Sequence, residues 1–153
     1  MRYKHTQTAP FYLILLLPSC AMFSGAWFVP QQLARLILIG SAAGMLLLAL
    51  MFKTLTVRDE GDSLRIQFGP LPIFGRSILF ANIDSVEQGR TSILDGFGIH
   101  LNRGGWVWNL WGFDCVELTL KKGRRMRIGT DDPTGLVAFL KEFVSQGHRK
   151  ESG

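Results

Sequence analysis

Charged residues are nearly absent from the first third of this 153-residue chain. No acidic residue precedes Asp59, and between Ala9 and Phe52 the only charged residue is Arg35. A helix on the surface of a soluble protein presents a polar face to water, and these apolar runs have none. We therefore expect residues 11–52 to lie in a membrane and not in the core of a soluble domain.

Cysteine and histidine are scarce, with two Cys and three His in the chain. Cys20 and Cys115 form neither a metal-binding spacing nor a disulfide framework, and two free thiols suit a reducing compartment. The motifs of common hydrolases, zinc enzymes, redox proteins and phosphate-binding loops do not occur. We predict a protein that is not an enzyme and needs no cofactor or metal. His100 fits a surface residue, and a functional role beside Asp95 or Asp114 is the alternative.

The basic residues do not indicate a nucleic acid partner. The whole chain has a net charge of +5, but Arg2, Lys4 and Arg35 belong to the apolar segment and its flank. After residue 52 there are 14 basic and 12 acidic residues, which leaves a net charge of +2. A domain this balanced lacks the positive field that draws proteins to nucleic acids.

Two uncharged runs are each long enough to cross a membrane as a helix. Residues 11–29 and residues 33–52 each approach the roughly 20 residues that a bilayer core of about 30 Å requires. Pro30 separates them, and so short a connection predicts an antiparallel transmembrane hairpin over residues 11–52. Residues 1–10 are then an N-terminal tail.

The positions of the basic residues predict the orientation of this hairpin. Arg2 and Lys4 precede the first span and Lys53 and Arg58 follow the second, whereas the intervening loop offers only Arg35. Loops rich in Lys and Arg remain in the cytoplasm. We therefore expect a multi-pass protein of the cytoplasmic (inner) membrane with both termini in the cytoplasm.

Small residues recur at a spacing of four in both spans. They are Ala21 and Gly25 in the first span, and Gly40 and Gly44 in the second. Such positions allow helix backbones to approach closely in lipid. We expect them to pack the two helices of the hairpin together, with homodimerisation through Gly40 and Gly44 as the alternative.

After Lys53 the pattern changes to the alternation of half-buried strands, which predicts a β domain over residues 53–147. Strand-like runs lie at residues 54–58, 64–68, 76–80, 84–90, 98–102, 106–110, 116–120 and 126–128. An amphipathic helix over residues 133–146 follows, with Asp132 as its N-cap and Gly147 as its end. Residues 148–153 are expected to form a basic tail.

Seven or eight antiparallel strands followed by one C-terminal helix are the layout of the pleckstrin-homology fold, a bent sandwich or partly open barrel capped by that helix. Residues 84–140 resemble bacterial membrane-anchored pleckstrin-homology-like domains. The motifs that carry the resemblance are Asp84-Ser85-Val86-Glu87, Gly96-Phe97-Gly98-Ile99-His100, Gly105-Trp106-Val107-Trp108-Asn109 and residues 127–133 (RIGTDDP). Because this fold hosts lipid, peptide and protein binding alike, the resemblance implies a binding module and not a particular ligand.

Two groups of side chains are candidates for partner contact. The first is basic: Lys121, Lys122, Arg124, Arg125 and Arg127. The second is aromatic: Trp106, Trp108 and Trp111. The basic group is either a solvated hairpin or a contact with anionic lipid, and the tryptophans are either core or a contact patch.

These observations favour a membrane-tethered, non-catalytic binding or scaffolding module that recognises a protein or peptide partner beside the bilayer. An anionic-lipid-binding module that uses the basic hairpin is the alternative. An enzyme of unknown class is the third and weakest possibility.

Overall fold

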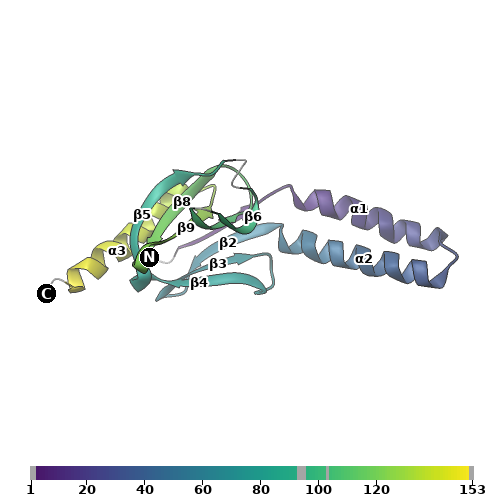
Figure 1. Ribbon diagram of the computed structural model, residues 1–153, viewed down its shortest axis with the longest axis horizontal. Coiled ribbons are helices and arrows are strands. Elements are labelled where there is room, and N and C mark those ends of the chain that lie inside the picture. Colours follow the sequence, from purple (N-terminus) through teal and green to yellow (C-terminus); the bar gives the residue numbers. More distant parts are fainter. Residues whose placement is uncertain (1–2, 93–95, 103, 152–153) are drawn as a thin grey trace.

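The computed structural model describes residues 3–92, 96–102 and 104–151, with residues 146–151 as backbone only. Two antiparallel helices project from one end of a β-rich domain, and a third helix extends from the opposite end (Figure 1). The molecule is therefore elongated, and its two ends have very different chemistry.

The N-terminal segment is part of the β domain. Residues 4–8, which we expected to lie in a tail, form strand β1 (Lys4–Thr8) and pair antiparallel with β2 (Thr54–Asp59). The sequence KHTQT has no apolar alternation, so its pattern did not indicate a strand. The polar side chain of Gln7 is only 4% exposed. Contacts with the rest of the fold bury it, and a local sequence pattern does not show such contacts. The helices are thus an insertion between two neighbouring strands of one sheet.

The inserted helices are α1 (Tyr12–Gly25), extended by a short 3-10 turn η1 (Ala26–Phe28), and α2 (Gln32–Met51). Within the part of the chain that the structure describes, only α2 is long and apolar enough to cross a membrane. The prediction of two full-length spans therefore needs correction. The apolar helical stretch before α2 covers residues 12–28 only, because Phe11 and Val29 of the expected first span lie outside it.

The two helices do not pack through the four residues that we expected. Their buried residues are Ser19, Ala26, Ala42 and Ala49, together with Met51 at the end of α2. The Ser19 hydroxyl donates a hydrogen bond of 2.8 Å to the carbonyl oxygen of Ala42. Ala21, Gly40 and Gly44 are exposed, and apart from the backbone of the same helix and the neighbouring residues no described atom lies within 4 Å of a Cβ built on Gly25, Gly40 or Gly44. The four-residue spacing identifies residues that share one face of a helix, but it does not show whether that face points toward the other helix.

Two sheets form the β domain. The first has the order β1-β2-β3-β4, with β3 at Ser63–Phe68 and β4 at Phe74–Leu79. The second has the order β5-β8-β9-β7-β6, with β5 at Ile83–Arg90, β6 at Gly98–Asn102, β7 at Gly105–Asn109, β8 at Asp114–Leu120 and β9 at Arg124–Gly129. With β1 the described residues contain nine strands, and β7 pairs with β9 in parallel. The prediction of seven or eight antiparallel strands was wrong on both points.

The two sheets share one core, which the predicted alternation identifies well. Leu64, Ile66 and Phe68 of β3 are fully buried, and the Phe68 ring lies 5.9 Å from that of Trp108 in the second sheet. Further buried members come from alternate positions of β2, β8 and β9: Leu55, Val57, Val116, Leu118, Leu120, Met126 and Ile128. Removing these side chains from water is the main force that holds the sheets together.

Helix α3 (Pro133–Glu151) packs against β5 and β8 of the second sheet. Asp132 caps it as predicted, because its Oδ1 accepts a hydrogen bond of 3.0 Å from the backbone N–H of Gly135. Leu136, Phe139 and Leu140 are buried on one stripe. The helix continues through Gly147 to Glu151, so the predicted end at residue 146 and most of the predicted basic tail are corrected. A helical glycine costs only about 1 kcal/mol, which does not stop a helix.

Candidate functional site

Four of the five basic candidates lie together where β8 turns into β9. Lys121 and Lys122 belong to a short 3-10 turn, η4 (Lys121–Gly123), and Arg124 and Arg125 begin β9. All four side chains are exposed. The backbone of Lys122 is in the left-handed region at φ 72°, and Gly123 has the same value, so the turn is tight. The structure therefore concentrates positive charge on one hairpin tip.

Arg127 does not belong to this exposed group. Its Nε lies 2.9 Å from Oε1 of Glu117 on the neighbouring strand β8, and its side chain is only 24% exposed. A charge paired in this way attracts a further anion much less than an unpaired one does. The residue contributes to strand pairing more than to a contact surface.

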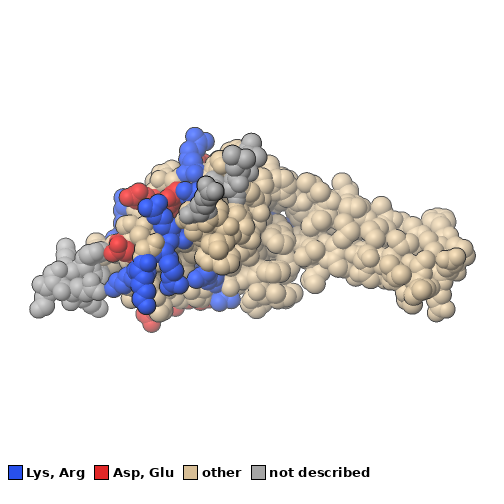
Figure 2. Space-filling view, in the orientation of Figure 1, with Lys and Arg blue, Asp and Glu red and all other residues tan. Residues whose placement is uncertain are grey.

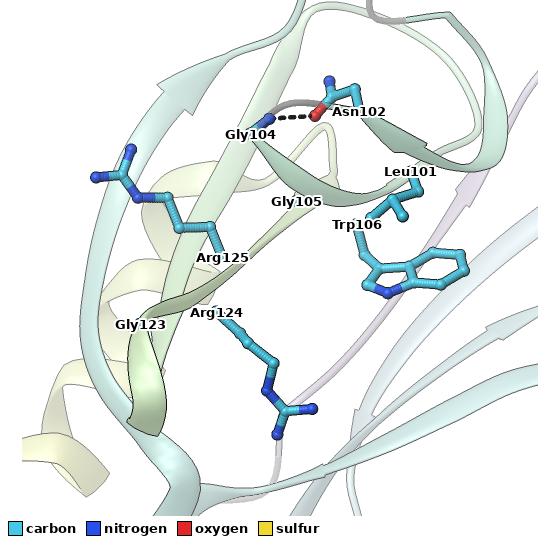
Figure 3. Close-up of a pocket in the computed structure, with 8 residues that line it drawn as sticks. All are labelled: Leu101, Asn102, Gly104, Gly105, Trp106, Gly123, Arg124 and Arg125. Carbon is cyan, nitrogen blue, oxygen red and sulfur yellow. Dashed lines mark hydrogen bonds between the residues drawn. The ribbon is translucent and has the colours of Figure 1, made fainter.

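The basic tip forms one wall of an open groove. The groove has a volume of about 430 Å³ and is lined by Leu101, Asn102, Gly104, Gly105, Trp106, Gly123, Arg124 and Arg125. Figure 3 shows these residues around the junction of the β6–β7 turn and the start of β9. The turn is held by a hydrogen bond of 2.8 Å from the backbone N–H of Gly104 to Oδ1 of Asn102.

Glycine at position 105 makes this groove possible. Its φ is +110°, and a Cβ there would lie 2.1 Å from the carbonyl oxygen of Arg125. The parallel pairing of β7 with β9 brings the two backbones this close. A side chain at this position would push the β6–β7 turn away from β9 and change the groove.

The groove offers two kinds of contact to a ligand. Arg124 and Arg125 supply planar guanidinium groups that match carboxylates and phosphates. Leu101 and Trp106 are 64% and 40% exposed and supply apolar surface. Figure 3 shows the two arginine side chains leaving β9 in opposite directions, Arg124 toward the side on which the Trp106 ring lies and Arg125 away from it. An extended acidic segment with an apolar residue fits this chemistry.

The basic tip lies at the end of the β domain that is remote from the helices. Trp111, three residues before β8, has its ring 4.6 Å from the ring of Phe11, which directly precedes α1. Strand β8 then runs away from this point over seven residues, a rise of about 20 Å, before the tip begins. Figure 2 shows the Lys and Arg side chains gathered over the β domain, whereas the visible face of the helices has none.

The structure separates the three candidate tryptophans. Trp108 is 5% exposed and belongs to the core. Trp106 lies at the groove, with the guanidinium carbon of Arg76 5.9 Å from its ring centroid. Trp111 is 41% exposed at the opposite end of the domain. They therefore form no single patch, although Trp106 contributes to the groove.

A second polar cluster ties β1 to the start of α3. The Tyr3 hydroxyl donates a hydrogen bond of 3.2 Å to Oδ2 of Asp132, and His5 Nε2 contacts Oδ1 of Asp131. Burial, together with the Asp132 and Asp131 carboxylates, raises the pKa of the Tyr3 hydroxyl, so Tyr3 remains a donor. Sequence analysis missed this cluster because β1 itself was missed.

His100 lies on β6 with its Nε2 buried, and among the described residues that atom has no hydrogen-bond partner. The Asp114 carboxylate instead contacts Nε of Arg90 at 3.6 Å, and Asp95 lies outside the described residues. Across the described part of the chain, no three His, Cys, Asp or Glu side chains gather as they would around a metal ion.

Comparison of the chain with protein-family models and with curated proteins gives no match. The chemistry and the position of the groove are therefore the features that indicate a function.

Proposed function

We propose that this chain is a membrane-anchored, non-catalytic binding module. Its helices lie in the bilayer, and its β domain binds an acidic segment of a protein or peptide partner in the groove between the β6–β7 turn and β9. The observation that supports this most strongly is the position of Arg124 and Arg125, which follow β8 at the end of the domain opposite the helices. There the groove faces the aqueous compartment, in which a soluble partner is accessible.

The helices have the properties of a membrane anchor. Helix α2 has 20 residues, most of them apolar, and a length of about 30 Å, and α1 with η1 covers about 27 Å. Trp27 and Phe28 at the turn between them are 84% and 87% exposed, and aromatic side chains are enriched at membrane interfaces. Arg35 donates hydrogen bonds to the carbonyl oxygen of Val29 near this turn, where a charge can reach water. We therefore propose that both helices cross the bilayer.

We further propose that both termini and the β domain are cytoplasmic. The pairing of β1 with β2 keeps the two ends of the helical insertion on one side. Lys4, Lys53 and Arg58 lie on that side, and Arg35 is alone on the other, which favours the cytoplasm for the domain.

The strand order supports a pleckstrin-homology-like domain. A meander of four strands is followed by β5, β8 and β9 in a second meander and then by α3. The β6–β7 hairpin is inserted between β5 and β8, and the membrane helices between β1 and β2. Under this proposal the family resemblance extends over the whole β domain.

The same geometry disfavours the anionic-lipid alternative. If α1 and α2 lie in the bilayer, the tip at Lys121–Gly123 is about 20 Å beyond the end of the domain that meets the membrane. Salt screens exposed charges over about 8 Å at physiological ionic strength. The tip is therefore too remote to bind the bilayer that holds its own helices.

Binding of a labelled hexaglutamate peptide to the full-length protein in nanodiscs of zwitterionic lipid tests the groove. Replacing both Arg124 and Arg125 by Gln should weaken the peptide affinity by about tenfold, since two charge-assisted contacts are lost. Lys121→Gln with Lys122→Gln is the matched control, because it removes the same charge from the same tip outside the groove lining. It should weaken binding by about twofold at most. Equal losses in the two double variants would contradict the groove.

A further inference from the structure

We infer that the end of the β domain facing the helices is itself a membrane-contact surface that inserts into the headgroup region of the bilayer. This inference rests on the proposed anchoring of α1 and α2. We call the surface the apolar base and define it by five side chains: Leu71, Ile73, Phe97, Trp111 and Phe113.

The first part of the apolar base is the loop between β3 and β4. Gly69 begins this loop, and a Cβ on it would lie 2.6 Å from Cα of Met51, the last residue of α2. The loop is therefore level with the end of that helix. Leu71 and Ile73 follow and are 44% and 62% exposed.

The second part lies beside the start of α1. The Phe11 ring is 4.9 Å from that of Phe97 and 4.6 Å from that of Trp111. Phe97, Trp111 and nearby Phe113 are 44%, 41% and 42% exposed. Three loops far apart in sequence thus present apolar side chains at the level where both helices leave the domain.

The chemistry of the described loop residues fits a lipid interface. Residues 69–74, 96–97 and 110–113 contain no charged side chain, and the one acidic residue of the β5–β6 loop, Asp95, lies outside the described residues. At the same level, the Lys53 ammonium lies 5.4 Å from the centroid of the Tyr12 ring. Lysine and aromatic residues at the ends of apolar helices are typical anchors in the headgroup region. The bilayer that receives α1 and α2 is continuous with this surface, so it is the natural occupant.

The consequence is a fixed orientation of the domain. Two helices alone would allow the domain to tilt, whereas contact through three loops holds its base against the bilayer. Exposed apolar groups in the interface then favour the geometry in which the groove of Arg124 and Arg125 faces away from the lipid.

A fluorescence depth measurement on the full-length protein in vesicles tests the apolar base. An NBD fluorophore is attached to Leu71→Cys, Ile73→Cys or the control Leu79→Cys, each in a Cys20→Ser background; Cys115 is buried. Leu79 is also an exposed apolar residue, 53% exposed, at the other end of β4 and about 17 Å farther away. Lipids with nitroxide-labelled headgroups should remove about half of the emission from positions 71 and 73 and almost none from position 79.

Equal, weak quenching at positions 71, 73 and 79 would overturn the inference. A second result would also overturn it. If the emission at positions 71 and 73 is blue-shifted in a way that depends on protein concentration, and the nitroxides do not quench it, then a second copy of the protein covers the apolar base. A fluorophore at Leu38→Cys, in the middle of α2, separates these results from a failure of anchoring. If acyl-chain nitroxides do not quench the fluorophore at position 38, then α2 does not lie in the bilayer, and the proposed function itself is contradicted.

Discussion

Phe139→Ala is expected to lower the free energy of unfolding of the β domain by about 3–5 kcal/mol, the usual cost of emptying a buried aromatic site. The Phe139 side chain is 7% exposed and connects three parts of the fold. Its ring lies 5.2 Å from Tyr3 before β1, 5.9 Å from Phe80 before β5 and 5.0 Å from Phe143 on α3. The loss is a large part of the 5–15 kcal/mol that typically stabilises a domain.

Urea unfolding of the full-length protein in detergent micelles, followed by tryptophan fluorescence, measures this loss. Lys141→Ala is the control, because Lys141 is exposed on the same helix and alanine favours helix. It should change the free energy of unfolding by no more than about 0.5 kcal/mol. If Phe139→Ala unfolds at the same urea concentration as Lys141→Ala, then α3 does not close the core.

Gln7→Pro should destabilise the domain by about 2–3 kcal/mol, the upper range for single substitutions. The N–H group of Ala9 donates to the carbonyl oxygen of Lys53, and the N–H group of Asp59 donates to the carbonyl oxygen of Tyr3. Hydrogen-bonded pairs recur at every second residue of an antiparallel ladder, so residues 3, 5, 7 and 9 form them and the N–H group of Gln7 points toward β2. Proline removes that donor. The substitution also removes the buried Gln7 amide, whose Nε2 donates a 2.9 Å hydrogen bond to the carbonyl oxygen of Trp111.

Thr6→Pro is the matched control for this strand. The N–H group of Thr6 points out of the edge of the sheet, where proline is tolerated. The same urea titration should therefore separate the two variants by at least about 1 kcal/mol. Identical unfolding of both would mean that β1 is not paired as described, and that residues 54–153 form the domain without it.

The sequence predicted the elements whose apolar pattern is strong. Helix α2, the alternation of β2, β3, β8 and β9, and the Asp132 cap of α3 were all identified, because burial sets those patterns directly. Strand β1 was missed because its residues are polar and it gains its place only by pairing with β2. The parallel β7–β9 pair was missed because periodicity carries no information about strand order.

The candidate site was predicted in composition but not in place. The basic run at residues 121–127 was identified as a group, yet only pairing with Glu117 shows that Arg127 differs from the others. Trp106 and Trp108 share a strand, but only contacts made in the fold show that Trp108 is buried beside Phe68 whereas Trp106 is 40% exposed. The direction of the tip relative to the helices is a property of the fold and has no local signal.

Both α1 and α2 are proposed to cross a membrane and to leave the β domain in the cytoplasm. Labelling with a membrane-impermeant maleimide in intact bacterial cells tests this topology, with one cysteine introduced at Gln31→Cys or Lys122→Cys in the Cys20→Ser background, in which the remaining Cys115 is buried. Position 31, in the turn between the helices, should react in intact cells, and position 122 should react only after the inner membrane is permeabilised. Reaction of both positions under the same condition would overturn the transmembrane hairpin, because the turn and the domain would then lie on one side of the membrane.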